Sequence, residues 1–179
     1  MKKLGIVTAL LVGLATTTVA YAERIRATLI GYEEVPSVST VASGEFRAKI
    51  SPDDSSIDYE LTYSGLQGTV QQAHIHFAQR SVNGSIVIWL CQTDTTPAPD
   101  AVKDLELTPI CPQEGTVAGH ITTANVIAAS TTSQQITAGE LGEVIAAIRA
   151  GFAYANVHTT PLNPSGEIRG QIRAFHFKR

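Results

Sequence analysis

Hydrophobic and polar residues alternate along most of this chain, with the period of two that is typical of a β-strand buried on one face. The alternation is clearest where Ile57, Tyr59, Leu61 and Tyr63 share one face. Turn-forming stretches such as "SPDDSS" and "SVNGS" separate the alternating segments. Eight segments are predicted to be strands: 24–31, 44–50, 57–63, 69–77, 85–91, 114–122, 152–159 and 166–177. The second and third are joined by a short turn and predict a hairpin.

A single segment, residues 137–151, has helical periodicity. Its apolar positions follow the spacing i, i+3, i+4 and i+7: Leu141, Val144, Ile145 and Ile148. Thr137 followed by Glu140 fits a capping box, and Gly151 fits the position after the helix. About eight strands and one short helix in the C-terminal third predict an all-β fold, an antiparallel sandwich or barrel of the immunoglobulin-like or Greek-key kind.

The first 22 residues are predicted to be a secretory signal peptide. A basic start, "MKK", precedes an uncharged apolar run, and "AYA" supplies small residues for cleavage after Ala22. The alternative is a membrane anchor, but the apolar run is long enough only with its threonines, and no basic cluster follows it. We therefore expect one mature domain, residues 23–179, exported to a periplasm or the extracellular space without a transmembrane anchor.

Charge and cysteine content narrow the possible partners. The formal net charge is −3 and no basic block is present, so nothing in the sequence suggests nucleic acid as a partner. The two cysteines, Cys91 and Cys111, are predicted to form a disulfide if the chain is exported. The alternative is a cysteine metal ligand, although neither has a neighbouring His or Cys at the usual ligand spacing.

Four stretches stand in order along the chain: "YEEVP", "AHIHFAQRSVNGSIV", "AGFAYANVHT" and "PSGEIRGQI". Together they resemble the CHRD domain, a module named for chordin and also found singly in bacterial exported proteins. The resemblance extends over residues 26–173 and marks five motif residues: Glu34, Asn156, Glu167, Arg169 and Gly170. It implies an all-β, immunoglobulin-like or barrel-like fold. It also implies a binding role, because in chordin the module is associated with secreted signalling proteins.

Three of the predicted strands carry polar rows that could form one site. Residues two apart on a strand face the same way, so His74 and His76 share a face. His158 lies in a similar row with Asn156. If the rows converge, the three imidazoles could bind one copper or zinc ion. Glu167 would then be a fourth ligand or would orient a histidine through its second nitrogen.

The alternative is a polar network that fixes strand register without binding anything. His120 is a further candidate ligand, whereas His176, in the tail, is expected at the surface. Glu34 is expected to be a solvated or strand-end acid. Gly166 and Gly170 are expected at turns or at points of close backbone packing.

No catalytic signature is present, because the sequence has neither a nucleophile elbow nor a phosphate-binding loop. Five histidines are also too few for a dinuclear copper–zinc dismutase. We therefore expect a non-enzymatic exported module that binds an exported or envelope protein, or has a structural role. The alternative is a mononuclear copper or zinc protein built on His74, His76 and His158, which could also carry out redox chemistry. Recruitment of a partner to an exposed strand edge is a third hypothesis.

Overall fold

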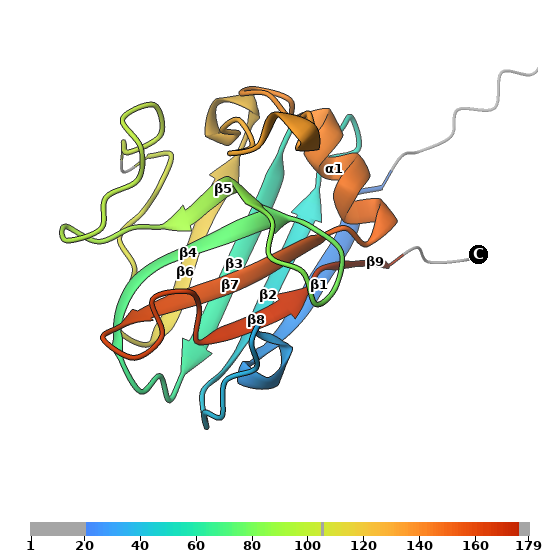
Figure 1. Ribbon diagram of the computed structural model, residues 1–179. Helices are drawn as coiled ribbons and strands as arrows, with labels where there is room; N and C mark the ends of the chain where they lie inside the picture. Colours follow the sequence, from blue (N-terminus) through green and yellow to red (C-terminus); the bar gives the residue numbers. More distant parts are fainter. Residues whose placement is uncertain (1–20, 105, 176–179) are drawn as a thin grey trace, which may run out of the picture.

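The computed structural model describes residues 21–104 and 106–175, which form an antiparallel β-structure (Figure 1). The expected signal peptide, apart from its last two residues, and His176 lie outside the described residues. The strands are β1 (Glu23–Ile30), β2 (Ser43–Ile50), β3 (Ile57–Ser64), β4 (Thr69–Phe77), β5 (Ser85–Cys91), β6 (Gly115–Ile121), β7 (Ala153–Thr160), β8 (Ile168–Gln171) and β9 (Arg173–Phe175). Three short 3₁₀ helices, η1 (Gly31–Glu33), η2 (Thr123–Asn125) and η3 (Thr132–Gln134), and one α-helix, α1 (Leu141–Ala150), complete the described part.

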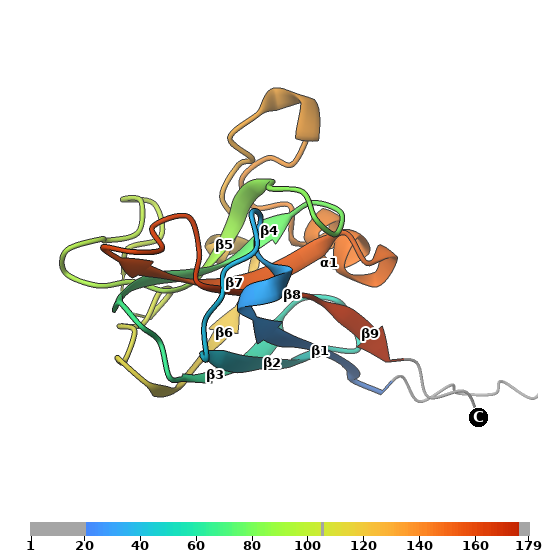
Figure 2. The same ribbon diagram turned by 60° about the horizontal axis from the view of Figure 1, so that its bottom comes forward.

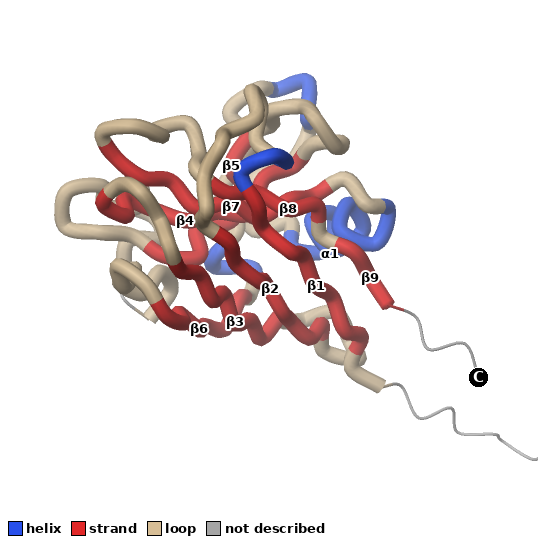
Figure 3. The backbone as a smooth tube through the Cα atoms, turned by 90° about the horizontal axis from the view of Figure 1, so that it is seen from below, coloured by secondary structure: helices blue, strands red, loops and turns tan. Residues whose placement is uncertain are grey.

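All of these strands belong to one sheet, in the order β5-β4-β7-β8-β1-β2-β3-β6, with β9 also pairing with β1. Figure 2 shows the sheet folded over on itself, so that β4, β5 and β7 lie above β1, β2, β3 and β6. The second group lies side by side in Figure 3. The terminal strands β5 and β6 approach each other, which leaves a nearly closed barrel. The prediction of an antiparallel all-β fold is confirmed.

The predicted hairpin is confirmed, because β2 and β3 pair over their full length from Ser43↔Ser64 to Ile50↔Ile57. One segment differs from its prediction. Residues 166–177 were expected to be a single strand, but the chain forms β8 beside β7 and then, after Ile172, β9 beside β1. This change of partner brings the strand count to nine among the described residues and helps β8 to join the two halves of the sheet.

The hydrophobic core fills the interior of the folded sheet, where the apolar face of each alternating strand points. Phe46, Leu61, Ile75 and Val157 come from four strands and are fully buried. Burying an apolar side chain of this size contributes about 1.5–3 kcal/mol. The alternation seen in the sequence is therefore the pattern that closes the barrel around its core.

Helix α1 lies beside one end of the strands and packs against β7 and β9 (Figure 1). Its four predicted apolar positions are all buried. Gly151 ends it in the left-handed conformation at φ 80°, as predicted. The start differs: the Glu140 carboxylate accepts from the Thr137 backbone N–H at 2.7 Å, but the helix begins only at Leu141. The two glycines nearby explain the late start, because glycine is a poor helix former.

Cys91 and Cys111 form the predicted disulfide, which excludes the alternative of a cysteine metal ligand. The bond joins the end of β5 to the residue just before Pro112 and closes the proline-rich loop between them. Among the described residues, no helix has the length and hydrophobicity that are required to cross a bilayer.

Candidate metal centre

The three histidines of the predicted site come from β4 and β7, which are neighbours in the sheet. His74 pairs with Asn156, and His76 pairs with Tyr154. Residues opposite each other in an antiparallel pair share a face, so these side chains lie on the same side of the sheet. Ala73, on the other face, is in the hydrophobic core. The polar rows therefore line the outer face of β4 and β7 and leave the core apolar.

Loops cover this outer face, so the histidines are buried although they lie outside the barrel core. His74 is fully buried, and His76 and His158 are each 7% exposed. One ring nitrogen from each of the three lies within 4.8 Å of the other two. The predicted convergence of the imidazoles is therefore observed.

Backbone carbonyl groups fix the tautomers of two of these rings. His76 Nδ1 donates to the Gly84 carbonyl at 2.9 Å, and His158 Nδ1 donates to the Pro164 carbonyl at 2.9 Å. A carbonyl can only accept, so each Nδ1 carries the proton and each Nε2 has a free lone pair. Metal-ligating histidines are usually oriented in this way through their second nitrogen.

Two ring nitrogens from different strands lie close together inside the cluster. His74 Nδ1 lies 3.3 Å from His158 Nε2, which also accepts from Asn156 Nδ2 at 2.7 Å. Two nitrogen ligands at about 2.0–2.1 Å from one ion, at a near-tetrahedral angle, are also roughly 3.3 Å apart. The two rings are therefore spaced to hold one ion if Asn156 Nδ2 releases His158 Nε2, while His76 would have to move closer.

Four buried polar atoms around this point have no hydrogen-bond partner among the described residues. They are Nε2 of His74, Nε2 of His76, Nε1 of Trp89 and Oδ1 of Asn156. Buried polar atoms are almost always paired, because an unpaired one costs about 1–3 kcal/mol. Their concentration at one place makes the cluster the leading candidate for a binding site among the described residues.

Burial keeps the three imidazoles uncharged. Desolvation lowers the pKa of His76 to about 4, with a further decrease from the nearby charges of His158 and Arg169. Desolvation also lowers the pKa of His158, and it lowers that of His74 well below the usual value. Neutral imidazole is the form that binds metal, so at neutral pH no proton has to leave before an ion enters.

Aromatic rings form the walls of the cluster. The His76 ring stacks on Tyr154 with centroids 4.6 Å apart, and the Trp89 ring meets His74 edge to face at 4.4 Å. The Arg169 guanidinium lies 3.3 Å from the centroid of the Tyr154 ring. Trp89 stands in an apolar run of the sequence, which by itself indicates only a buried residue. The pairing of His74 with Trp89 across β4 and β5, which puts the ring in this wall, is visible only in the fold.

Glu167 lies apart from the histidine cluster, although the sequence analysis offered it as a ligand or an orienting group. Its Oε1 accepts from Thr40 Oγ1 and the Gln67 N–H, both at 2.8 Å, and its Oε2 accepts from Thr159 Oγ1 at 2.6 Å. Burial alone would raise its pKa, but these hydrogen bonds outweigh burial and hold the pKa below its usual value. The structure thus gives Glu167 the role of joining three segments of the chain.

Glu34 was expected to be a solvated or strand-end acid, and that expectation is wrong. Its side chain is buried against Gly166, and desolvation raises its pKa to about 7, although the positive charge of Arg169 acts in the opposite direction. The Arg169 guanidinium in turn donates to the Val82 carbonyl at 2.8 Å and to Asn83 Oδ1 at 3.2 Å. These contacts join segments that are distant in sequence, so local pattern could not reveal them.

Two other sequence candidates are placed away from the cluster or in structural roles. His120 is exposed on β6, where its Nδ1 lies 2.6 Å from Asp58 Oδ1. Gly170 lies where β8 crosses β1, and a side chain there would collide with the Thr28 carbonyl. The expectation of close backbone packing at Gly170 is therefore confirmed.

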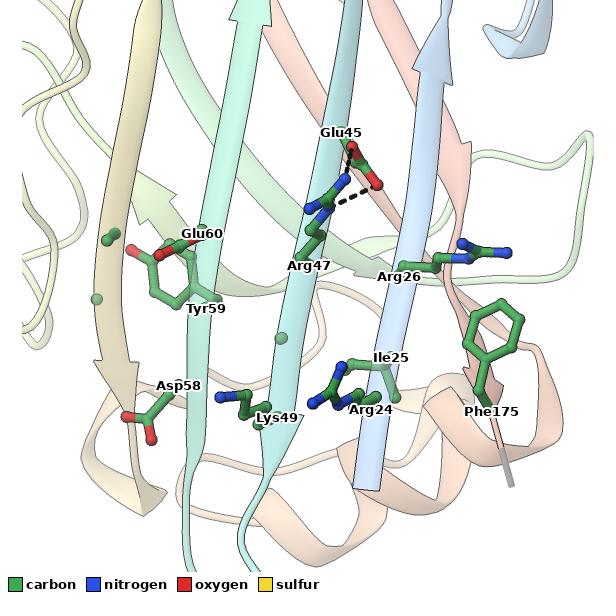
Figure 4. A pocket seen from close by; sticks show the side chains of 13 residues that line it. Arg24, Ile25, Arg26, Glu45, Arg47, Lys49, Asp58, Tyr59, Glu60 and Phe175 are labelled. Atoms are coloured by element: carbon green, nitrogen blue, oxygen red, sulfur yellow. Dashed lines mark hydrogen bonds and ion pairs between the residues drawn. The ribbon is translucent and has the colours of Figure 1, made fainter. Parts of the chain in front are cut away.

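A groove of about 840 Å³ lies on the opposite half of the sheet, over β1, β2, β3 and β6. Figure 4 shows its charged side chains, with cations on β1 and β2 and the acids Asp58 and Glu60 on β3. Arg47 is paired with Glu45, and Arg26 lies over the Phe175 ring. Because none of the buried unpaired polar atoms found among the described residues lines this groove, the histidine cluster is the stronger candidate site.

Comparison with known families agrees with the four motifs. The model of the CHRD domain matches residues 25–172. The chain belongs to the CHRD-domain family. Searches of curated proteins and of solved structures give no match. The match includes every residue of the histidine cluster, and membership of this family suggests a non-enzymatic module of a kind that is typically extracellular.

Proposed function

We propose that this CHRD-domain protein is a non-enzymatic module that binds one copper or zinc ion through His74, His76 and His158. The observation that carries the proposal is the convergence of three buried imidazoles, of which His74 and His76 each have an unpaired Nε2. Second-nitrogen hydrogen bonds to Gly84 and Pro164 support it, because they orient two rings before any ion arrives.

The test is a titration of the chelator-stripped protein, residues 23–179, with Cu(II) and Zn(II), and with Cu(I) under anaerobic conditions. We expect 1:1 binding in the micromolar range or tighter for at least one ion. Binding should weaken by at least about 100-fold in His76→Ala and in His158→Ala, since each removes one of three ligands.

His120→Ala is the matched control, because this histidine is exposed and pairs with Asp58 away from the cluster. It should bind metal like the parent protein. Circular dichroism of each variant separates loss of a ligand from loss of the fold. Absence of binding for all three ions, or unchanged binding in the cluster variants, would leave the cluster as a polar network that fixes strand register.

We further propose that the protein is exported, with residues 1–22 as its signal peptide and residues 23–179 as its single domain. The disulfide supports this, because such bonds persist in oxidising compartments. Family membership also supports an extracellular role.

Binding to another exported or envelope protein is the second candidate function. The observation that favours it is that β6 ends the sheet and pairs with one strand only, so a partner strand could add there. Capture of a partner from native envelope, lost when a proline is placed in β6, would test it.

A further inference from the structure

The charge of the histidine cluster restricts which ion it can hold. Among the described residues, the group of potential ligands contains three imidazoles and neither a carboxylate nor a thiolate. Glu167 is held by Thr40, Gln67 and Thr159 instead. Three neutral ligands leave a bound ion with its full charge.

Burial raises the free energy of a bound ion that keeps its full charge. The three imidazoles are between 0% and 7% exposed, and the aromatic rings of Trp89 and Tyr154 lie against two of them. The free energy of moving an ion from water into such a site rises with the square of its charge, so a monovalent ion pays about a quarter of the penalty of a divalent one. The site therefore favours an ion of charge +1.

A buried cation beside the cluster acts in the same direction. β7 lies between β4 and β8, so the Tyr154 ring on β7 lies between His76 on β4 and Arg169 on β8. Arg169 is 1% exposed, so water screens its charge only weakly. The carboxyl group of Glu34 offsets this charge incompletely, because its pKa of about 7 leaves it partly protonated at neutral pH.

The number of ligands favours the same kind of ion as the charge of the site does. Zn(II) prefers four ligands in a tetrahedron, and Cu(II) prefers a square-planar or tetragonal set. Cu(I) is satisfied by two or three nitrogen ligands. On the basis of the function proposed above, we propose that the cluster of His74, His76 and His158 binds copper as Cu(I) in preference to Cu(II) and Zn(II).

The test measures three affinities on the same protein, residues 23–179. Cu(I) is measured anaerobically against a chromophoric Cu(I) chelator, and Cu(II) and Zn(II) against competitors suited to each ion. We expect Cu(I) to bind at least roughly 100-fold more tightly than Cu(II), because ligand number and charge both favour it. The copper-loaded protein should then have a reduction potential above that of the aqueous Cu(II)/Cu(I) couple.

Cu(II) affinity equal to or greater than Cu(I) affinity, or Zn(II) binding tighter than Cu(I), overturns this inference while leaving the proposed function in place. Absence of binding by all three ions overturns both. The comparison uses the unmodified protein, so it does not depend on whether any variant folds.

Two substitutions test the contribution of the buried arginine. Arg169→Gln should raise the affinity for Cu(II) and Zn(II) relative to Cu(I) by about 10-fold, because it removes a positive charge from a poorly screened position. Arg149→Gln is the matched control, since this exposed arginine on α1 pairs with Asp54 and Glu23. It should leave the ratio unchanged. If Arg169→Gln does not fold, Glu34→Gln replaces it as the test. This substitution removes the carboxylate that offsets Arg169, so the affinity for Cu(I) should rise relative to the affinities for Cu(II) and Zn(II). A relative rise in the affinities for the divalent ions would contradict the electrostatic argument.

Discussion

At the scale of single residues, the central feature is that three neutral imidazoles are buried together. Each is held by neighbours that a sequence pattern does not show: Gly84 for His76, Pro164 for His158 and Trp89 for His74. A neutral, preoriented imidazole is suited to binding a metal. It also makes the free energy of unfolding depend on pH, because an unfolded histidine binds a proton near pH 6.5 and these folded ones do not.

We therefore expect the metal-free protein to lose stability on mild acidification. As the pH falls below about 6.5, the unfolded chain takes up protons on these histidines that the folded chain refuses, so the free energy of unfolding falls. Glu34, with its pKa raised to about 7, acts in the opposite direction. Because three histidines oppose one glutamate, the free energy of unfolding should fall by a net amount of roughly 2 kcal/mol between pH 7.5 and pH 5.5. Urea unfolding at the two pH values measures it.

His76→Gln is the informative variant for this prediction. It removes one of the three groups, so the pH-dependent loss should shrink by about 1 kcal/mol. Stability that is unchanged between the two pH values in the parent protein would show that the histidines are not held neutral.

At the scale of elements, the junction between the two halves of the sheet depends on β8. This short strand pairs with β7 along Asn156↔Arg169 and meets β1 at Ile30↔Arg169. Gly170 permits the close approach, since any side chain would meet the Thr28 carbonyl. The same strand supplies Arg169 to the Tyr154 ring, so one packing constraint supports both the barrel and the wall of the cluster.

We expect Gly170→Ala to reduce the free energy of unfolding by about 2–3 kcal/mol, because the clash is with backbone and cannot be relieved by a rotamer change. Gly142→Ala is the matched control. It lies in α1 with nothing within 4 Å of the added methyl group, so it should stabilise by about 0.5–1 kcal/mol. Chemical denaturation of both variants measures the difference, and equal stabilities would contradict the assigned role of Gly170.

At the scale of the whole molecule, the Cys91–Cys111 disulfide and the proposed signal peptide lead to one prediction about maturation. The first strand begins at Glu23, directly after the predicted cleavage site. When the full-length chain is expressed in a bacterium with a secretory pathway, its mature form should start at Glu23 and carry the Cys91–Cys111 disulfide. Intact-mass analysis with and without reductant measures both. A start at Met1 in the isolated protein would argue against export through this segment.

Much of this architecture could be predicted from local pattern, because period-two alternation reports which strand faces meet the core. The strands, the hairpin of β2 and β3, and the end of α1 at Gly151 all follow from it. The exchange of partners between β8 and β9 could not be predicted, because both strands continue one alternating segment and only the barrel separates them.

For the candidate site, the sequence alone determined which side chains share a strand face, and so offered His74, His76 and His158 together. Only the tertiary structure decided that these faces meet and that loops bury them. It also decided that Glu34 is buried and that Glu167, also buried, bonds to Thr159 and not to a histidine. The physical reason is the separation in sequence between the residues that determine each property. Strand periodicity is set by neighbouring residues, whereas burial and charge depend on contacts between segments that are up to about a hundred residues or more apart.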